Sequence, residues 1–331
     1  MILSRLIPNH SLPPHVDLPA GSFQYQLSHL PKSPDPLSPL TPLSPGLPNI
    51  ASQDPTRKTH VMSILNLTPD SFSDGGRHFN LQSPELSSIV TSHIQSGATI
   101  LDLGGQSTRP GAPQVSAEEE LSRVLPAVEL IKRLPGTSNV AISIDTYRAD
   151  VASAAIRAGA HIVNDVSAGL LDPAMLSTVA QLGCTICLMH MRGTPETMSS
   201  LTTYPDGVVT GVARELLARV RAAEDAGIRR WRIILDPGIG FAKTQAQNLE
   251  LLRRLDELRR FPGLEGFPWL VGASRKGFIG KITGVREAKE RVWGTAAAVV
   301  AAVQGGSEVV RVHDVREMGQ VVRMADAIWR V

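Results

Sequence analysis

The sequence predicts an α/β protein folded as a (β/α)8 barrel, and three observations support this prediction. Short apolar runs alternate with helical patterns from Lys58 onward, eight such units follow one another, and every apolar run ends in a polar tip. Strands that alternate with helices form a parallel sheet, because parallel neighbours need a crossover connection. An open, doubly wound sheet is the alternative. It usually carries a Gly-x-Gly-x-x-Gly turn after its first strand, and none follows the first run here.

The predicted strands are short, continuous apolar runs, which are typical of strands buried on both faces of a parallel sheet. In order they cover residues 61–65, 99–103, 140–144, 161–163, 185–189, 232–235, 269–271 and 308–312.

The segments between these runs carry the start and stop signals of helices. Ser116-Ala-Glu-Glu119 and Thr244-Gln-Ala-Gln247 predict capping boxes, in which the two side chains each accept a backbone N–H at the helix start. Ser83-Pro84 and Asp172-Pro173 predict two further helix starts. The predicted helix ends are glycines, namely Gly97, Gly159, Gly183, Gly227 and Gly305.

Composition excludes several classes of function. Of the 331 residues, 42% are hydrophobic, which is enough for a large core. Lys and Arg number 33 and Asp and Glu 31, so the net charge of +2 indicates neither a nucleic-acid nor a membrane surface. Aromatic residues make up 4%, too few for a platform that stacks single-stranded bases. No run approaches the ~20 apolar residues of a membrane helix.

Two regions of the chain have different composition. Residues 1–57 are rich in Pro, Ser and Leu and predict an extended linker or tail, whereas residues 58–331 form the predicted barrel domain. Arg is sparse in the leader, so a linker to an upstream domain is favoured over a mitochondrial presequence. Cys184 and Cys187 lie on one predicted strand, where a spacing of three points them to opposite faces, so we interpret them as core thiols. Two cysteines fit a reducing compartment, which predicts a cytoplasmic or mitochondrial-matrix protein that is not secreted.

Polar and reactive side chains stand at all eight predicted strand ends. Asp or Asn after a strand often caps the next helix, but such tips need no Lys, Arg or His. A barrel gathers its strand ends on one face, so the set together predicts one site at the barrel mouth. The tips are, in order, Asn66; Asp102 with the 104–111 loop; Asp145; Asn164 with Asp165; Met189 with His190; Asp236; the 274–277 turn; and Arg311 with His313.

These tips divide into two kinds of chemistry. Asp145, Asn164 and Asp236 offer acceptors for a flat heterocycle with an amidine-like N–H edge, and Lys276 offers a donor. An anion-binding set lies on other tips, and a glycine-rich loop beside it lets backbone N–H groups approach oxygens. The 274–277 turn opens a helix and predicts a second anion seat. The anion set comprises Thr108, Arg109, Arg311 and His313.

Five motifs, at residues 64–76, 107–111, 236–241, 274–276 and 311–314, closely resemble those of the dihydropteroate synthase family. The sequence near residues 57–63 is similar to that of fungal members of the family. In fungi this domain is commonly the C-terminal part of a multifunctional folate biosynthesis protein. The resemblance implies a TIM barrel of the pterin-binding type. It also implies a transferase of alkyl or aryl groups other than methyl, which is the target of sulfonamides. Such an enzyme condenses 7,8-dihydropterin-6-ylmethyl diphosphate with p-aminobenzoate to give 7,8-dihydropteroate and pyrophosphate, by pyrophosphate loss and arylamine attack on a pterin methylene cation.

The resemblance also implies roles for single residues. The implied pterin-binding residues are Asp145, Asn164, Met189, Asp236, Phe241 and Lys276. The diphosphate would contact Asn66, Thr108, Arg109, Arg311 and His313, and p-aminobenzoate would contact Phe72, Pro110, Ser274 and Arg275. Mg²⁺ is the implied cofactor, with Asn66 and Asp70 as its ligands. The implied catalytic set is Asp145, Lys276, Arg109, Arg311 and His313.

A homodimer is expected from the same resemblance. The Ala-rich helix at 294–303 is a candidate interface, although burial against the barrel would explain its composition equally well. One departure is Gln106, where the family frequently has Glu, and it affects the expected loop closure. Two alternative functions remain. A corrinoid-type pterin-binding methyltransferase would not need the anion set, and a catalytically silent barrel would not need filled reactive positions.

Overall fold

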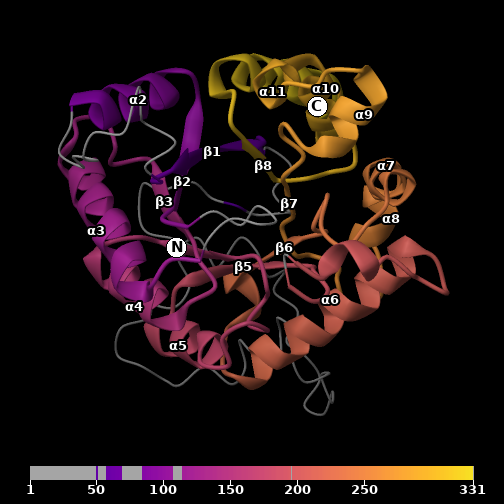
Figure 1. Ribbon diagram of the computed structural model, residues 1–331, viewed down its shortest axis with the longest axis horizontal. Helices are drawn as coiled ribbons and strands as arrows, with labels where there is room; N and C mark the ends of the chain where they lie inside the picture. Colours follow the sequence, from indigo (N-terminus) through magenta and orange to yellow (C-terminus); the bar gives the residue numbers. More distant parts are fainter. Residues whose placement is uncertain (1–49, 51–56, 69–83, 107–113, 195, 331) are drawn as a thin grey trace, which may run out of the picture.

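Eight parallel strands form a barrel inside a ring of helices (Figure 1). The computed structural model describes residues 50, 57–68, 84–106, 114–194 and 196–330. The strands are β1 His60–Asn66, β2 Ala98–Gly104, β3 Ala141–Asp145, β4 Ile162–Asp165, β5 Thr185–Met189, β6 Ile233–Asp236, β7 Leu270–Val271 and β8 Val309–Val312. All eight predicted strands are confirmed, and five of them extend one or two residues further at the carboxyl end, where the polar tip still belongs to the strand.

The sheet closes on itself. Its strand order is β6-β5-β4-β3-β2-β1-β8-β7. The two outer strands meet through a parallel bridge between Leu235 and Trp269, where the Leu235 N–H donates to the Pro268 carbonyl at 2.9 Å. The (β/α)8 barrel is therefore confirmed and the open doubly wound sheet is excluded.

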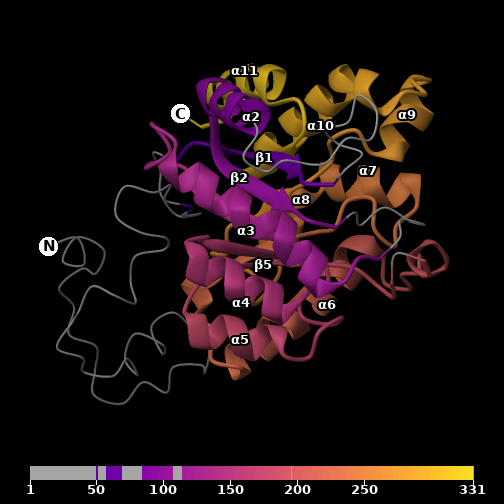
Figure 2. The same cartoon turned by 60° about the vertical axis from the view of Figure 1, so that its left-hand side comes forward.

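Helices cover the outside of the barrel (Figures 1 and 2). They are α2 Pro84–Gln95, α3 Ala117–Arg133, α4 Ala149–Ala158, α5 Met175–Leu182, α6 Val208–Asp225, α7 Gln245–Arg253, α8 Leu255–Arg259, α9 Gly277–Thr283, α10 Val292–Gln304 and α11 Val315–Trp329. Short 3₁₀ helices lie at Met198–Ser200, Arg230–Arg232 and Ala288–Glu290. Within the described part of the chain, no helix is long and apolar enough to cross a membrane.

The two predicted capping boxes have different outcomes. The box at Thr244 and Gln247 is complete, with both reciprocal hydrogen bonds present. Ser116 accepts the Glu119 N–H at 3.1 Å, but the Glu119 carboxylate pairs with Arg123 instead of reaching back. Only half of the predicted box therefore forms at α3, because a nearby guanidinium competes for the carboxylate.

Two apolar cores flank the sheet. The larger core lies between the strands and the helices, and the smaller one fills the barrel around residues near the strand starts, such as Met62, Ile100 and Val309. Cys187 belongs to the inner core and Cys184 to the outer one, so the prediction of two opposed core thiols is confirmed. Burial raises the pKa of the Cys184 thiol to about 11, which leaves it unreactive near neutral pH.

Two residues of the predicted leader are described and contact the barrel, and one of them, Arg57, pairs with Glu308 at 3.6 Å. Ile50 is 8% exposed and packs in the inner core with Met62 and Val309. Its apolar side chain closes the end of the barrel where the strands begin. The rest of the predicted 1–57 linker lies outside the described residues, so its extended character stays a prediction.

Candidate active site

The carboxyl ends of the first four strands bring polar side chains to one edge. Asn66 pairs in register with Gly104, Gly104 with Asp145, and Asp145 with Asn164. Because Gly104 has no side chain, Asn66 and Asp145 approach each other across it. A Cβ on Gly104 would lie 3.8 Å from both Asn66 Oδ1 and Asp145 Oδ2. The register therefore gathers residues that are separated by up to a hundred positions in the sequence.

Arg311 connects the acids of this edge. Its Nε donates to Asp102 Oδ2 at 2.6 Å and its Nη2 donates to Asp145 Oδ2 at 2.5 Å. Asn164 Nδ2 donates to the same Asp102 oxygen at 3.1 Å. The predicted heterocycle-binding pair of Asp145 and Asn164 and the predicted anion-binding Arg311 therefore lie in a single hydrogen-bonded cluster.

The cluster is charged and buried. Burial raises the pKa of Asp145 to about 7, Arg311 lowers it, and the neighbouring Asp102 charge raises it further. Burial disfavours the charge of Arg311, but Asp102 and Asp145 outweigh it and raise the arginine pKa. Asp102 Oδ1 and Asp145 Oδ1 are buried and have no hydrogen-bond partner among the described residues. A buried acceptor without a donor is costly, so an N–H group that reached either oxygen would be favoured there.

A second cluster forms at the ends of β6 and β7. Asp236 Oδ1 accepts the Gly238 N–H at 2.7 Å, and burial raises the pKa of Asp236 while Lys276 lowers it. Lys276 lies 4.5 Å from the centroid of the Phe241 ring and donates to the Ile239 carbonyl. Burial lowers the pKa of Lys276 to about 8, while Asp236 favours its charged form.

An apolar wall lies beside the two charged clusters. Val166, Met189 and Met191 pack together, with Tyr147 and Phe241 against them. Met189 also pairs in register with Asp236 across β5 and β6. A flat ring bordered by this wall would meet carboxylates at its edge, which is the arrangement that the sequence predicted for a heterocycle.

The comparison with protein families agrees with this geometry. The family described as "Pterin binding enzyme" matches residues 62–313. The chain belongs to the pterin-binding enzyme family.

Its relatives within this family include bacterial and fungal proteins. The chain is 50% identical over 275 residues to the dihydropteroate synthase of Synechocystis sp., covering 83% of this chain and 91% of the relative. It is 50% identical over 272 residues to the folic acid synthesis protein fol1 of Pneumocystis carinii, covering 82% of this chain. The chain spans 36% of the length of that fungal relative.

Solved structures of pterin-binding enzymes have the same fold. The Yersinia pestis dihydropteroate synthase with a sulfonamide drug complex matches with a TM-score of 0.73 and 40% identity, over 83% of this chain and 95% of that one. The Xanthomonas albilineans dihydropteroate synthase in complex with 7,8-dihydropteroate matches with a TM-score of 0.71 and 38% identity, over 84% and 96%.

The ends of β7 and β8 place the remaining described members of the predicted site. Ser274 Oγ accepts the His313 N–H at 3.2 Å and lies 3.1 Å from His313 Nδ1. Arg275 has a φ of +60° and its guanidinium pairs with Asp314, with Nε at 3.0 Å from Oδ2. Helix α9 begins immediately afterwards at Gly277, as predicted. In this pterin-binding domain, Ser274 thus orients His313, and Arg275 is engaged by Asp314. Their predicted contacts to p-aminobenzoate stay predictions.

Several predicted residues lie outside the described part of the chain. They are Asp70, Phe72, Thr108, Arg109 and Pro110. Of the predicted Mg²⁺ ligands, Asn66 is described, and within the described ranges no three His, Cys, Asp or Glu side chains cluster as a metal site. The oxygens of Asn66 and Asp145 that face each other across Gly104 are nevertheless the hard donors that Mg²⁺ accepts.

Sequence reasoning missed two features. Asp102 was noted only as a strand tip, yet it accepts from both Arg311 and Asn164 and is fully buried. The signal was a carboxylate inside an apolar strand. Gln106 was treated as a loop residue, but its Oε1 accepts from Arg148 at 2.6 Å and its Nε2 donates to Tyr147 at 3.1 Å. Gln106 is thus linked to the apolar wall of the pterin-binding mouth.

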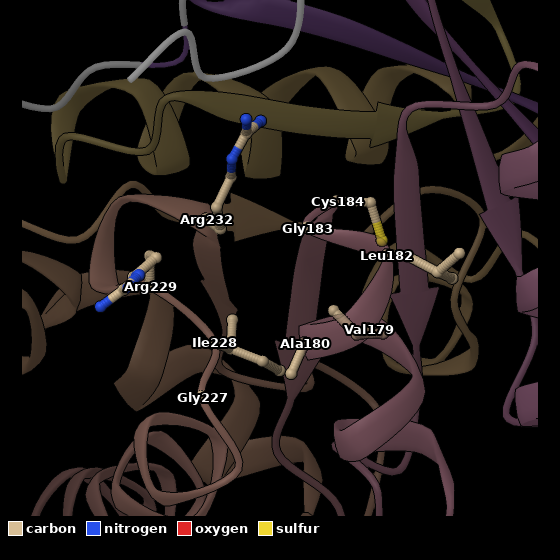
Figure 3. Close-up of a pocket in the computed structure, with 9 residues that line it drawn as sticks. All are labelled: Val179, Ala180, Leu182, Gly183, Cys184, Gly227, Ile228, Arg229 and Arg232. Atoms are coloured by element: carbon tan, nitrogen blue, oxygen red, sulfur yellow. The ribbon is translucent and has the colours of Figure 1, made fainter. Parts of the chain in front are cut away.

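A separate cavity of about 400 Å³ lies at the opposite end of the barrel (Figure 3). Cys184 and Arg232, which line it, stand just before β5 and β6, whereas the polar tips follow the strands. Its other lining residues are Val179, Ala180, Leu182, Gly183, Gly227, Ile228 and Arg229. Enzymes with this barrel fold place their chemistry at the carboxyl ends of the strands, so we assign the active site to the mouth and not to this cavity.

Proposed function

We propose that the protein is a dihydropteroate synthase, which condenses 7,8-dihydropterin-6-ylmethyl diphosphate with p-aminobenzoate to give 7,8-dihydropteroate and pyrophosphate. The observation that carries the proposal is that three predicted residues converge on one rim, namely Asp145, Asn164 and Arg311. Asn164 and Arg311 both donate to Asp102, and Arg311 also donates to Asp145. Identity of 50% to the Synechocystis dihydropteroate synthase, over nearly its whole length, supports it.

The pterin would sit against the apolar wall with its N–H groups toward the carboxylates. Asp236 would accept two parallel N–H groups, and Asp145 Oδ1, which has no partner among the described residues, would accept another. Lys276 would donate to the ring carbonyl or a ring nitrogen. Both carboxylates lie in a buried mouth, where an electrostatic contact is stronger than in water.

The reaction then needs charge stabilisation more than a base. The C–O bond to the diphosphate breaks first, and both of its electrons leave with pyrophosphate. The remaining methylene cation is conjugated with the ring, where the Asp145 carboxylate stabilises it. The arylamine attacks this carbon, the C–N bond forms, and the amine proton passes to solvent. A neutral arylamine is nucleophilic enough, so no catalytic triad is required.

The leaving pyrophosphate would be held at the outer side of the cluster. Arg311 and His313 would neutralise part of its charge, together with Thr108 and Arg109. We propose that Asn66 and Asp70 hold Mg²⁺, which would supply further positive charge to the leaving group when bound. Arg311 already touches Asp102 and Asp145, so one guanidinium borders both the pterin end and the diphosphate end of the site.

Assembly and compartment follow from the relatives and from one helix. Fungal and plant relatives are named as folic acid synthesis or bifunctional folate synthesis proteins, so we propose covalent or non-covalent association with other folate-pathway domains. Two plant relatives are named as mitochondrial, and we propose either the mitochondrial matrix or the cytoplasm. A homodimer through α10 is proposed because Trp293 on this helix is 85% exposed and no charged residue interrupts its outer stripe, formed by Trp293, Ala296, Ala297, Val300 and Ala301.

The test is an assay of the purified protein with both substrates and Mg²⁺, read as dihydropteroate formed. We expect turnover in the wild type and its loss in Asp236→Ala, together with at least a hundredfold weaker pterin binding by calorimetry. Asp206→Ala, which removes an exposed carboxylate paired with Arg214, serves as the matched control and should keep both properties. Pterin binding without pyrophosphate binding would instead favour the corrinoid-type methyltransferase. If the protein binds neither pterin nor pyrophosphate, a catalytically silent barrel is favoured.

A further inference from the structure

The loop of residues 237–243, which follows β6, has an unusual backbone. Gly238, Gly240 and Ala242 have φ values of +67°, +85° and +47°. Glycine adopts such values freely, but a left-handed alanine is strained and persists only where its surroundings hold it in place. The loop carries Phe241 into the apolar wall, and its Gly238 N–H donates to Asp236 Oδ1 at 2.7 Å. Its shape therefore sets the geometry of the pterin end of the site.

A buried lysine, which the proposed reaction does not use, holds this loop from behind. Lys243 is 9% exposed, and its Nζ donates to the Phe241 carbonyl at 2.9 Å. The same Nζ lies 2.9 Å from His190 Nδ1. The backbone carbonyl of Ala242, the residue before Lys243, accepts a hydrogen bond from the Tyr204 hydroxyl at 3.1 Å. Lys276 donates to the Ile239 carbonyl of the same loop, so two lysines hold its backbone.

A network of hydrogen bonds and ion pairs in turn fixes the position of Lys243. His190 Nε2 lies 3.0 Å from Glu215 Oε2, and Glu215 also accepts from Arg192, which stacks 3.8 Å over the Tyr204 ring. His190 therefore carries its proton on Nε2 and turns the lone pair of Nδ1 toward Lys243. Burial, followed by the Lys243 charge, lowers the pKa of His190 to about 4, which agrees with a neutral ring.

We propose that Lys243 is a positioning residue for pterin binding: through the Phe241 carbonyl it fixes the 237–243 loop, and as a buried cation near Asp236 it favours the ionised form of that carboxylate. This inference rests on the proposed function, because it assigns Lys243 to the same pterin end. Lys243 does not touch the substrate in this arrangement. It acts through Phe241 and Asp236.

Several charges face Lys243 from the elements packed around it. Asp236 and Glu215 favour its charged form, whereas Lys276 and Arg192 oppose it, and neutral His190 accepts from it. Burial, the largest influence, lowers the pKa of Lys243 to about 7. The ammonium form is thus complete below this value and is lost as the pH rises through it. The contribution of the lysine to pterin affinity should decline over the same range.

The experiment compares Lys243→Met with the wild type. Met keeps most of the side-chain volume but removes the charge and the donor. At about pH 6 we expect roughly tenfold weaker binding of a 6-hydroxymethyl pterin by calorimetry, which is the loss of one charged hydrogen bond. At about pH 8.5 the ratio of the two dissociation constants should fall to about twofold, because the wild-type lysine has then lost its charge. The KM for p-aminobenzoate should change less than about twofold.

Lys132→Met is the matched control, because Lys132 Nζ also donates to a backbone carbonyl, that of Ala158 at 2.7 Å, on the outside of the barrel. It should leave pterin affinity unchanged at both pH values, and melting temperatures of both variants separate a folding defect from a site defect. Equal pterin affinity of Lys243→Met and wild type at about pH 6, or a ratio that does not change with pH, would overturn the inference. A wild type that binds no pterin would overturn the proposed function instead.

Discussion

At the scale of single residues, Arg311 links the two buried acids of the first charged cluster. One guanidinium serves two buried acids, Asp102 and Asp145, and each of these keeps one oxygen without a partner among the described residues. Two carboxylates this close repel each other when both are ionised, and a shared cation offsets that repulsion. Arg311 therefore keeps Asp145 available as an ionised acceptor, in addition to its proposed contact with the diphosphate.

Replacing Arg311 by Met should affect stability, the pH dependence of binding and pyrophosphate affinity together. Unpairing two buried acids costs about 3–5 kcal/mol of unfolding free energy. Arg311 is also the influence that lowers the pKa of Asp145, so without it that pKa rises above about 7. Ionised Asp145 then appears only at higher pH, and pterin affinity should rise with pH over a higher range than in the wild type. Denaturant unfolding measures the first effect, and calorimetry with pterin over pH and with pyrophosphate measures the other two.

Arg230→Met provides a control for the arginine change. Arg230 also forms an ion pair, with Glu224 at 3.1 Å, and stacks 4.2 Å over the Phe267 ring, but it lies before β6 and not at the mouth. It should lower stability without moving the pH dependence of pterin binding. An Arg311→Met protein with the wild-type pH dependence would contradict the assigned role of Arg311.

At the scale of elements, the strands were predictable and the contacts between their ends were not. Apolar runs with polar ends are a local signal, so all eight strands were found. The partners of Arg311 are 209 and 166 residues away in the sequence, and no local pattern encodes that proximity. Asp102 was missed as a site residue for this reason. The half-formed cap at Ser116 has a local cause that the capping motif alone does not show, because Arg123, four residues after Glu119, pairs with its carboxylate.

The loop after β6 should tolerate no side chain at Gly238. Its φ is +67°, and an added Cβ would lie 1.9 Å from the His190 carbonyl oxygen, a backbone atom that cannot move aside. Gly238→Ala should therefore displace the loop and reduce pterin binding at least tenfold, while destabilising the protein by more than the ~1–2 kcal/mol of a left-handed alanine. Calorimetry and denaturant unfolding measure these two effects.

Gly183→Ala separates the clash from the strain. Gly183 has a similar φ of +63° at the end of α5, but a Cβ there would meet nothing within 4 Å. This variant should lose only about 1–2 kcal/mol and keep its pterin affinity. If the two alanine variants behave alike, the close approach to His190 is not what makes Gly238 necessary.

At the scale of the whole molecule, the two ends of the barrel have different roles. The carboxyl ends of the strands gather the charged clusters, and the starts of the strands are closed by apolar packing that includes Ile50. The sequence predicted the first end well, because reactive residue types stand out at strand tips. It did not predict the second, because a single Ile in a Pro-rich segment carries no pattern that distinguishes it from its neighbours.

The outer surface of the molecule leads to the last prediction, which concerns the proposed dimer. Trp293 on α10 is 85% exposed, and Met324 and Ile328 on the neighbouring α11 are also exposed. Exposed large apolar side chains on adjacent helices are typical of a surface covered by a partner. Trp293→Asp should place a charge in the interface, shift the protein from dimer to monomer in sedimentation velocity, and leave the folded barrel intact by circular dichroism. Leu170→Asp, which changes an exposed apolar residue in the loop after β4, should leave the dimer unchanged. A wild type that sediments as a monomer, or a Trp293→Asp protein that remains dimeric, would show that α10 is not the interface.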